Sequence, residues 1–231
     1  MEFTGEFFVP GKAGKRIEQD HLARYEFATR FAAGKRVLDI ACGVGYGARM
    51  LRDAGARVTG VDINPELIRY ATETYGADDL MFEVGDVCRC QFKSEFDLVT
   101  SFETIEHVSD FQAALRCLHD ALKPGGTLIV STPNRPITSP RAKGIEDKPK
   151  NRHHVREFTV DEIVAALSEA GFEVRQDDIH GQRLRRMFKN PMLRWLQRRW
   201  LKPDLRASAQ VRPIRGLAPR YTVIVARRSD P

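Results

Sequence analysis

The chain has 231 residues, 42% of them hydrophobic, and a formal net charge of +6. This length suits one large α/β domain over residues 1–231, or one domain with an elaboration. No apolar run approaches the ~20 residues that cross a bilayer, and the acidic N-terminus and four cysteines argue against a secreted, disulfide-bonded protein. We therefore expect a cytoplasmic protein, with a position at the inner face of a membrane as the alternative.

Strands and helices alternate along the first 134 residues. Apolar runs predict the strands, and apolar residues at helical spacing fill the intervals between them. The predicted helices span 17–32, 48–55, 64–76 and 111–122, and the predicted strands span 35–41, 56–62, 80–86, 96–102 and 127–134. This alternation is typical of right-handed βαβ units, so we expect an α/β fold with a mainly parallel sheet.

The C-terminal part breaks this alternation. Residues 135–156 are polar and rich in Lys, Arg and Pro, and their length is typical of a lid or a substrate-binding loop. A helix at 159–171 begins with a capping box, and strands are predicted at 172–178 and 221–227. Between these strands, residues 179–220 form a basic elaboration, which includes a stretch of helical spacing around Trp195.

Positive charge is concentrated in this C-terminal part. From residue 175 onwards, fifteen Lys and Arg stand against four Asp and Glu, whereas the first 174 residues are net acidic. Such asymmetry indicates an anionic partner for the basic region, and nucleic acid, anionic lipid and a phosphorylated substrate all qualify. A solvated basic face is the plain alternative.

The stretch VLDIACGVGYG predicts a ligand site at the end of a strand. Asp39 lies near the strand end, and Gly43 and Gly45 follow in a turn where a ligand can approach the backbone closely. Asp62 ends the next strand, where a carboxylate can accept both hydroxyls of a ribose, and Asp86 ends the third. A glycine-rich turn alone also fits a dinucleotide-binding fold.

The order of these motifs resembles the class I S-adenosylmethionine-dependent methyltransferases over residues 17–178. The resemblance implies a seven-stranded, mainly parallel sheet with helices on both faces and an antiparallel last strand. It also implies S-adenosyl-L-methionine as the cofactor. The implied cofactor contacts are Asp39, Gly43 and Gly45 at the methionine part, Asp62 at the ribose, Asp86 at the adenine, Arg24 or Tyr25 over the carboxylate, and the neighbouring Ile63 and Val87. The structural alternatives are a turn former at Asp39, a helix cap at Asp86, and packing roles for Arg24 and Tyr25.

A second group of polar residues follows the fourth strand. The stretch SFETIEHVSD holds Glu103, Glu106 and His107, whose spacings of three and four bring side chains to one side of a helical turn. Carboxylate and imidazole ligands suit Mg, Mn, Fe or Zn, and His153 or His154 can supply a further ligand. We therefore expect a divalent metal, Mg or Mn, at this strand end.

The E-x-x-E-H pattern resembles two metal-dependent methyltransferase families. The small-RNA 3′-terminal 2′-O-methyltransferases align their later histidine with His154, and the ubiquinone-pathway O-methyltransferases align it with His153; we favour His154. The expected catalytic residues are then His107, His154 and Glu103. Without a metal, His107 is a general base or a residue that caps the loop.

The N-terminal segment 4–28 resembles the lead-in of methyltransferases from polysaccharide and natural-product pathways. We therefore expect O-methylation of a hydroxyl on a sugar, nucleoside or glycan-type small molecule. The alternatives are a ubiquinone-type catechol O-methyltransferase at a membrane surface, an RNA 2′-O-methyltransferase, and a cofactor-binding regulator without catalysis. Nucleic acid is the less favoured partner, because no RNA-binding module is recognisable.

Overall fold

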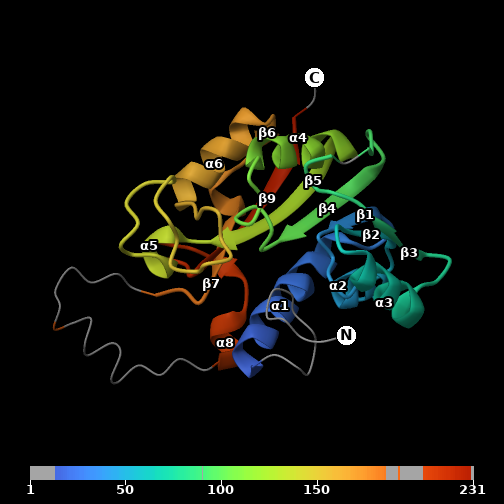
Figure 1. Cartoon of the computed structure of the whole chain (residues 1–231), viewed down its shortest axis with the longest axis horizontal. Helices are drawn as coiled ribbons and strands as arrows, with labels where there is room; N and C mark the ends of the chain where they lie inside the picture. The colour runs from blue at the N-terminus through green and yellow to red at the C-terminus, as the bar shows by residue number, and fades with distance from the viewer. Residues whose placement is uncertain (1–13, 90, 186–191, 193–204, 230–231) are drawn as a thin grey trace.

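One sheet forms the centre of the molecule (Figure 1). The structure is a computed structural model that describes residues 14–89, 91–185, 192 and 205–229. The strand order within these residues is β3-β2-β1-β4-β5-β9-β7-β8, and β6 pairs with β9. The strands are β1 (Arg36–Ile40), β2 (Arg57–Asp62), β3 (Leu80–Val84), β4 (Phe96–Phe102), β5 (Leu122–Pro133), β6 (Phe172–Glu173), β7 (Ile179–Gln182), β8 (Arg212–Pro213) and β9 (Tyr221–Arg228).

The helices precede, connect or follow these strands. They are α1 (Lys15–Ala28), α2 (Tyr46–Asp53), α3 (Pro65–Tyr75), α4 (Phe111–Ala121), α5 (Arg135–Thr138), α6 (Val160–Glu169) and α8 (Leu205–Ala209), with the 3-10 helices η1 (Thr29–Phe31) and η2 (Gln176–Asp178). The local sequence determines where several of these helices begin. Asn64 caps α3 by accepting a 2.9 Å hydrogen bond from the N–H of Glu66, and Thr159 and Glu162 form the predicted capping box of α6.

The first five strands run parallel to one another, as the alternating pattern predicts. The last strand, β9, pairs antiparallel with β5, which is also as expected. The predicted α/β fold class is therefore confirmed, although the sheet has nine strands within the described residues instead of the seven that the resemblance implied. Because the strands β1 to β5 all point the same way, the loops that follow them meet at one edge of the sheet.

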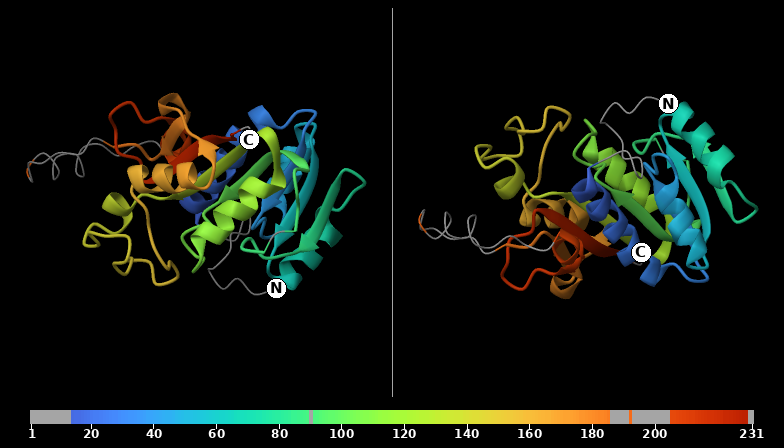
Figure 2. Two further views of the ribbon diagram at one scale, coloured as in Figure 1. Left: turned by 90° about the horizontal axis from the view of Figure 1, so that it is seen from above. Right: turned by 90° about the horizontal axis from the view of Figure 1, so that it is seen from below.

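Apolar side chains alternate along the central strands and fill a core on each face of the sheet. Val37 and Ile129 belong to the core that contains residues of α1, α2 and α3, whereas their neighbours Leu38 and Leu128 belong to the core with α4 and α6. The view from above shows α4 and α6 in front of the sheet, and the view from below shows α1 and α2 (Figure 2). The sheet is thus covered by helices on both faces.

The C-terminal side of the sheet departs from the predicted boundaries. The strand predicted at 172–178 is wrong in extent, because β6 ends at Glu173 and residues 176–178 form η2. The strand that pairs with the centre of β9 is β7, which lies in the segment predicted as an elaboration. The physical reason is the polar run of Gln176, Asp177 and Asp178, which offers no apolar side chain to either core, whereas Ile179 is buried.

The segment 135–156 leaves the sheet at β5 and returns beside the point where it left. Asn134 and Phe158 form a parallel bridge, and the N–H of Arg135 donates a 2.8 Å hydrogen bond to the carbonyl of Phe158. The guanidinium of Arg135 also donates to the carbonyl of Glu157 at 2.8 Å. The two ends of segment 135–156 are therefore held together by these hydrogen bonds, and we call this arrangement the closed base of the segment.

The stretch predicted to be helical around Trp195, with Arg194, Arg198 and Arg199, lies outside the described residues. In the parts of the chain that are described, no helix is long and apolar enough to cross a bilayer.

Candidate active site

The turn after β1 has the backbone conformation that its glycines predict. Gly43 has a φ of 57° and Gly45 a φ of 82°, in the left-handed region that favours glycine. A Cβ on Gly45 would lie 2.8 Å from the Cβ of Ala71 and 2.8 Å from the ring of Phe82, so no larger residue fits without movement. The helix α2 begins directly after this turn, and its first N–H groups lie beside the edge of the sheet.

Asp39 is buried at the end of β1, with 1% of its surface exposed. Its carboxylate accepts a 2.7 Å hydrogen bond from the hydroxyl of Thr100 and one of 3.1 Å to each oxygen from the hydroxyl of Tyr25. Burial raises the pKa of Asp39 to about 7; the two hydroxyl donors oppose this rise, and the neighbouring charge of Asp62 adds to it. Tyr25 therefore contacts Asp39 directly, which links α1 to the strand end.

Asp62 is fixed at the end of β2 by backbone donors. One carboxylate oxygen accepts from the N–H of Gly43 at 2.9 Å and the other from the N–H of Asn64 at 3.0 Å. Burial raises the pKa of Asp62, and these N–H groups oppose the rise. The next residue, Ile63, has 67% of its surface exposed, which leaves an apolar side chain beside the carboxylate.

Asp86 follows β3, next to the end of β2. The N–H of Gly85 donates a 3.0 Å hydrogen bond to the carbonyl of Asp62, which brings the two strand ends together. Asp86 itself accepts a 2.8 Å hydrogen bond from the N–H of Cys88, a local turn contact. The side chain of Val87 is buried in the core on the α4 face. The structure thus brings Asp86 to the edge that carries Asp39 and Asp62, and it places the side chain of Val87 in the core.

Arg24 reaches the same edge from α1 and is buried, with 1% of its surface exposed. Its guanidinium donates a 2.8 Å hydrogen bond to Gln182 of β7 and lies 3.7 Å from the carboxylate of Glu103. The guanidinium also lies over the ring of Tyr221, 5.3 Å from its centroid. Gln182 in turn donates to the carbonyls of Asp20 and Ala209, at 3.0 and 2.6 Å. This network holds α1 against β7 and α8.

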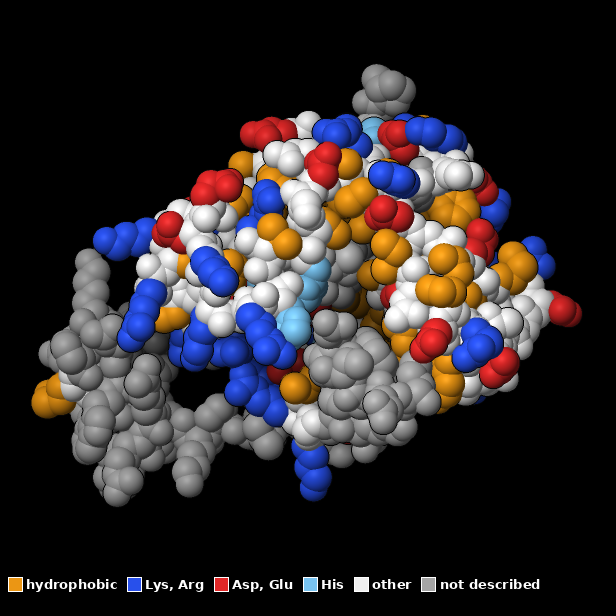
Figure 3. Space-filling view, viewed as in Figure 1, with side chains coloured by type: hydrophobic (Ala, Val, Ile, Leu, Met, Phe, Trp, Pro, Cys, Tyr) orange, Lys and Arg blue, Asp and Glu red, His pale blue; other side chains and the backbone are white. Residues whose placement is uncertain are grey.

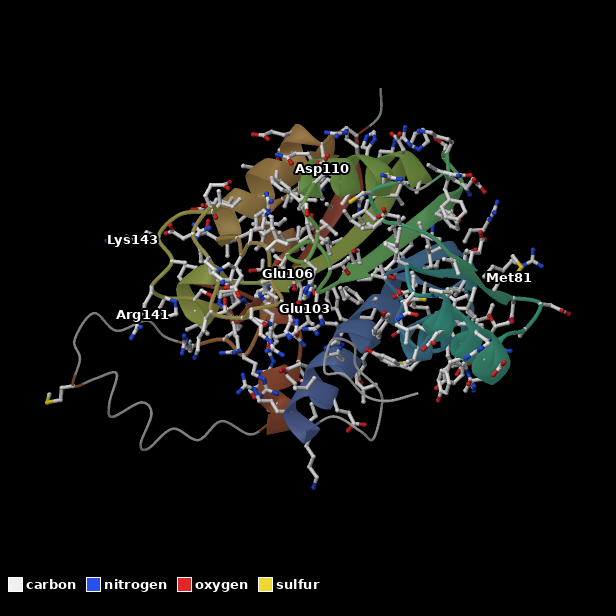
Figure 4. All side chains as sticks on the ribbon, viewed as in Figure 1. Met81, Glu103, Glu106, Asp110, Arg141 and Lys143 are labelled. Carbon is white, nitrogen blue, oxygen red and sulfur yellow. The ribbon has the colours of Figure 1, made fainter. Side chains whose placement is uncertain are left out.

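The turn after β4 gives the side chain of Glu103 a different direction from that of the residues that follow it. Glu103 has a φ of 52°, unusual for a residue other than glycine, and its carboxylate accepts a 2.8 Å hydrogen bond from the hydroxyl of Ser131. Glu103 and Glu106 lie at the end of β4 (Figure 4). This backbone conformation directs the carboxylate of Glu103 to Ser131 and Arg24, so it lies outside the group of ligand atoms described next, and its role as a metal ligand stays a prediction.

Glu106, His107 and His154 are brought together. Each offers one ligand atom, and these atoms all lie within 4.8 Å of one another. The rings of His107 and His154 meet edge to face, with centroids 4.9 Å apart. We call these three residues the Glu-His-His cluster; histidine side chains border a hollow on this face of the molecule (Figure 3). Of the two candidate histidines, His154 enters the cluster, whereas the side chain of His153 is exposed.

The carboxylate of Glu106 is fully buried, and only one of its oxygens is hydrogen-bonded. Oε2 accepts a 3.2 Å hydrogen bond from the hydroxyl of Thr132, whereas Oε1 has no partner among the described residues. Burial raises the pKa of Glu106 well above its usual range, and the neighbouring charge of Glu103 adds to the rise. A buried, unpartnered carboxylate oxygen is costly unless a cation or a donor approaches it.

The two histidine rings are oriented by hydrogen bonds to their Nδ1 atoms. His107 Nδ1 lies 3.0 Å from the carbonyl of His153, and His154 Nδ1 lies 2.8 Å from the carboxylate of Glu157. Both contacts place a proton on Nδ1 and leave Nε2 as the acceptor. The Nε2 of His154 is 2.8 Å from the side-chain amide of Asn151, which a metal ion would have to displace. Burial lowers the pKa of His107 and the nearby His154 lowers it further, whereas the contact with the His153 carbonyl and the charge of Glu103 oppose this, so the net shift favours the neutral imidazole.

Several residues of the site were not predicted. Glu157 lies three residues after His154, and an H-x-x-E spacing could have indicated it. Thr100 and Thr132 belong to predicted strands but carry no motif. Gln182 lies 158 residues from Arg24 in the chain, and no local signal indicates that contact.

Comparison with known proteins identifies the family of this chain. Residues 15–177 match a family described as a methyltransferase domain. A probable S-adenosylmethionine-dependent methyltransferase of Mycolicibacterium smegmatis is 33% identical over 176 residues, which are 75% of this chain and 66% of that protein. A ubiquinone biosynthesis O-methyltransferase of Xanthomonas euvesicatoria pv. vesicatoria is 33% identical over 160 residues, 64% of this chain and 66% of that protein. The matches therefore span just under two thirds of these relatives.

Solved structures share the fold at lower identity. An S-adenosylmethionine-dependent methyltransferase from Mesorhizobium loti superimposes with a TM-score of 0.62 at 22% identity, covering 90% of this chain and 100% of that one. An N1-methyltransferase from Burkholderia thailandensis, with bound S-adenosylhomocysteine, gives 0.60 at 18% identity, covering 92% and 79%. Because the family match covers most of the chain, the chain belongs to the methyltransferase domain family, and it shares the fold of the S-adenosylmethionine-dependent methyltransferases compared above.

Proposed function

We propose that this protein is an O-methyltransferase that transfers the methyl group of S-adenosyl-L-methionine to a hydroxyl of a sugar, nucleoside or glycan-type small molecule, with the help of a divalent metal ion. The observation that carries the proposal is the Glu-His-His cluster, which follows β4 beside the strand ends proposed to hold the methyl donor. An acceptor must arrive at this position to meet the methyl group.

The cofactor site is assigned to the acidic strand ends. Asp39 and the turn at Gly43 and Gly45 receive the methionine part, Asp62 the ribose and Asp86 the adenine. Ile63 offers an exposed apolar side chain for the adenine or ribose to lie against. Arg24 is the proposed partner of the cofactor carboxylate, held by Gln182. Two residues have a narrower role than predicted: Tyr25 positions Asp39, and Val87 contributes through its backbone, because its side chain is buried in the core.

The Glu-His-His cluster fits a divalent metal. Glu106 Oε1 is buried without a partner, and His107 and His154 keep Nε2 as an acceptor while their Nδ1 atoms are occupied. One carboxylate oxygen and two imidazole nitrogens suit a divalent transition metal such as Mn²⁺, Fe²⁺ or Zn²⁺ better than Mg²⁺, which prefers oxygen ligands. When bound, such an ion lowers the pKa of an acceptor hydroxyl and orients adjacent oxygens.

The protein's own residues position the acceptor and receive its proton. Glu103 is the carboxylate outside the cluster, 3.7 Å from Arg24, and it is proposed to accept the hydroxyl proton. In the metal-free alternative, the neutral His107 accepts that proton at Nε2. Both routes use the same turn after β4.

The proposal is tested by metal binding and methyl transfer together. Mn²⁺ binding is measured by electron paramagnetic resonance, and turnover with radiolabelled cofactor on a panel of sugars, nucleosides and catechols. We expect Glu106→Gln and His154→Asn to abolish Mn²⁺ binding and to lower turnover more than 100-fold. The matched control is His153→Asn, which removes a neighbouring imidazole outside the cluster. We expect this variant to retain both Mn²⁺ binding and turnover. Metal binding that survives Glu106→Gln, or turnover unaffected by a chelator, would contradict the metal site.

A second candidate is a catechol O-methyltransferase of the ubiquinone type. It is favoured by the relatives named ubiquinone biosynthesis O-methyltransferases at 33% identity. The acceptor panel separates the two candidates, because turnover confined to catechols would reject the sugar or nucleoside substrate. Methylation of RNA oligonucleotides alone would reject both.

A further inference from the structure

The segment 139–156, which we call the basic loop, carries an excess of positive charge and leads into the Glu-His-His cluster. It holds six Lys and Arg, at positions 141, 143, 148, 150, 152 and 156, against Glu146 and Asp147. All of these cations except Arg156 are exposed. Arg141 and Lys143 lie on this loop, away from Glu103 and Glu106 at the end of β4 (Figure 4), and Lys and Arg side chains gather on the same face of the molecule as the histidines (Figure 3).

The basic loop is anchored to the rest of the protein. Ile145 packs against the core on the α4 face, and Pro149 is buried. The N–H of Lys150 donates a 2.7 Å hydrogen bond to the hydroxyl of Ser139, which ties one side of the loop to the other. At its end, the N–H of Val155 donates a 2.8 Å hydrogen bond to the carbonyl of Glu106. The exposed cations therefore sit on a fixed backbone that leads into the cluster.

Most of the charge on this loop is not neutralised locally. Asp147 accepts from the N–H groups of Lys143 and Gly144, at 2.6 and 3.0 Å. Arg156 has a structural role, because it donates to the carbonyl of Ser109 and lies over the ring of Phe111. Within the described ranges, the side chains of positions 141, 148 and 150 form no ion pair, and Arg152 donates a 3.2 Å hydrogen bond to the imidazole of His153.

The proposed cations lie close to His154 along the chain. Lys150 lies four residues before His154 and Arg152 lies two before it, so their Cα atoms are at most ~14 and ~7 Å from that of His154. The cations at positions 150 and 152 are therefore close enough to the cluster in the chain for one small substrate to reach both an anion site here and the cluster.

We propose that Lys148, Lys150 and Arg152 bind a phosphate or diphosphate group of the acceptor, so that the substrate is a soluble phosphorylated or diphosphate-linked hydroxyl compound. This inference rests on the proposed function, since it assumes that the acceptor hydroxyl lies at the Glu-His-His cluster. Three exposed cations match the two to three negative charges of a diphosphate.

Two other anionic partners fit less well. A segment that enters a membrane interface needs several large apolar side chains, whereas the exposed large hydrophobic residue of this loop is Val155. Single-stranded RNA binding relies on exposed aromatic rings that stack with bases, and residues 139–156 contain no Phe, Tyr or Trp.

The experiment measures binding of inorganic pyrophosphate to the full chain by isothermal titration calorimetry, at low salt and in the presence of a chelator. The test variant carries Lys148→Gln, Lys150→Gln and Arg152→Gln. The matched control carries Arg57→Gln, Arg69→Gln and Arg116→Gln, which remove the same charge from exposed positions on β2, α3 and α4. Binding of S-adenosylhomocysteine is measured on the same samples.

We expect the test variant to weaken pyrophosphate binding about tenfold or more and the control less than twofold, while both bind S-adenosylhomocysteine like the wild type. Equal weakening in both variants, or no binding of pyrophosphate to the wild type, would overturn the proposal. So would loss of binding to anionic phospholipid vesicles or to an RNA oligonucleotide in the test variant with pyrophosphate binding unchanged. If instead the wild type binds pyrophosphate but not S-adenosylhomocysteine, the proposed function fails while the anion site stands.

Discussion

Cofactor affinity is predicted to depend on pH through Asp39. The carboxyl group of Asp39 is buried, and its pKa is raised from 3.8 to about 7. Near pH 6 it is therefore mostly protonated in the free protein, and above pH 8 it is ionised. If the carboxylate receives the positively charged ammonium group of the cofactor, only the ionised form binds it well. Proton release then accompanies binding, and affinity rises with pH.

The size of the effect follows from this pKa. For a ligand that requires the ionised carboxylate, the apparent dissociation constant is multiplied by one plus the ratio of protonated to ionised Asp39. With a pKa of about 7, that factor is about 11 at pH 6 and about 1.1 at pH 8. The expected change is therefore about tenfold, which corresponds to ~1.4 kcal/mol.

The assay is calorimetric titration of S-adenosylhomocysteine at several values between pH 6 and pH 8. The perturbation is Asp39→Asn, which keeps the side-chain shape and removes the titrating group. We expect this variant to bind weakly with an affinity that no longer rises with pH. Asp86→Asn is the matched control, since it removes a carboxylate at the same sheet edge and should weaken binding while keeping the slope. A tenfold rise that persists in Asp39→Asn would refute the assignment.

Three further predictions concern stability and are read from urea denaturation. Gly47→Ala would place a Cβ 2.0 Å from the ring of Tyr25, so we expect a loss of about 1–3 kcal/mol; an unchanged midpoint would show that the ring moves freely. Gln182→Leu leaves the buried guanidinium of Arg24 without its 2.8 Å partner, so we expect a loss of about 1–3 kcal/mol together with weaker binding of S-adenosylhomocysteine, and unaltered binding would argue against a link between β7 and the cofactor. Thr159→Ala removes the cap of α6 and should cost about 1 kcal/mol without affecting ligand binding, whereas a loss of binding would mean that α6 contributes to the site.

The cofactor side of the site could be predicted from local sequence, because the fold converts local signals into proximity. Asp39, Asp62 and Asp86 each end a strand, and parallel strands bring their carboxyl ends to one edge. The tight turn after β1 could also be predicted from its glycines, since the positive φ values that it requires are rare in other residues. These signals need no knowledge of contacts between distant residues.

The arrangement of the residues after β4 could be predicted only in part. Spacing paired Glu103 with Glu106 and with His107, whereas the three ligand atoms that lie within 4.8 Å of one another come from Glu106, His107 and His154. The direction of Glu103 depends on a φ of 52°, which the tertiary contact with Ser131 selects and which a helical turn does not contain. The boundary of β7 was missed for a similar reason, because pairing with β9 decides it.

The closed base of segment 135–156 has an evolutionary consequence. Because Asn134 and Phe158 are bridged, the chain leaves and re-enters the sheet at neighbouring points. Substitutions of the exposed residues between positions 139 and 150 can therefore accumulate without moving β5 or α6. Under the proposed assignments, acceptor preference and donor binding are separable traits, and descendants of one ancestral enzyme can change what they methylate while the donor site stays as it is.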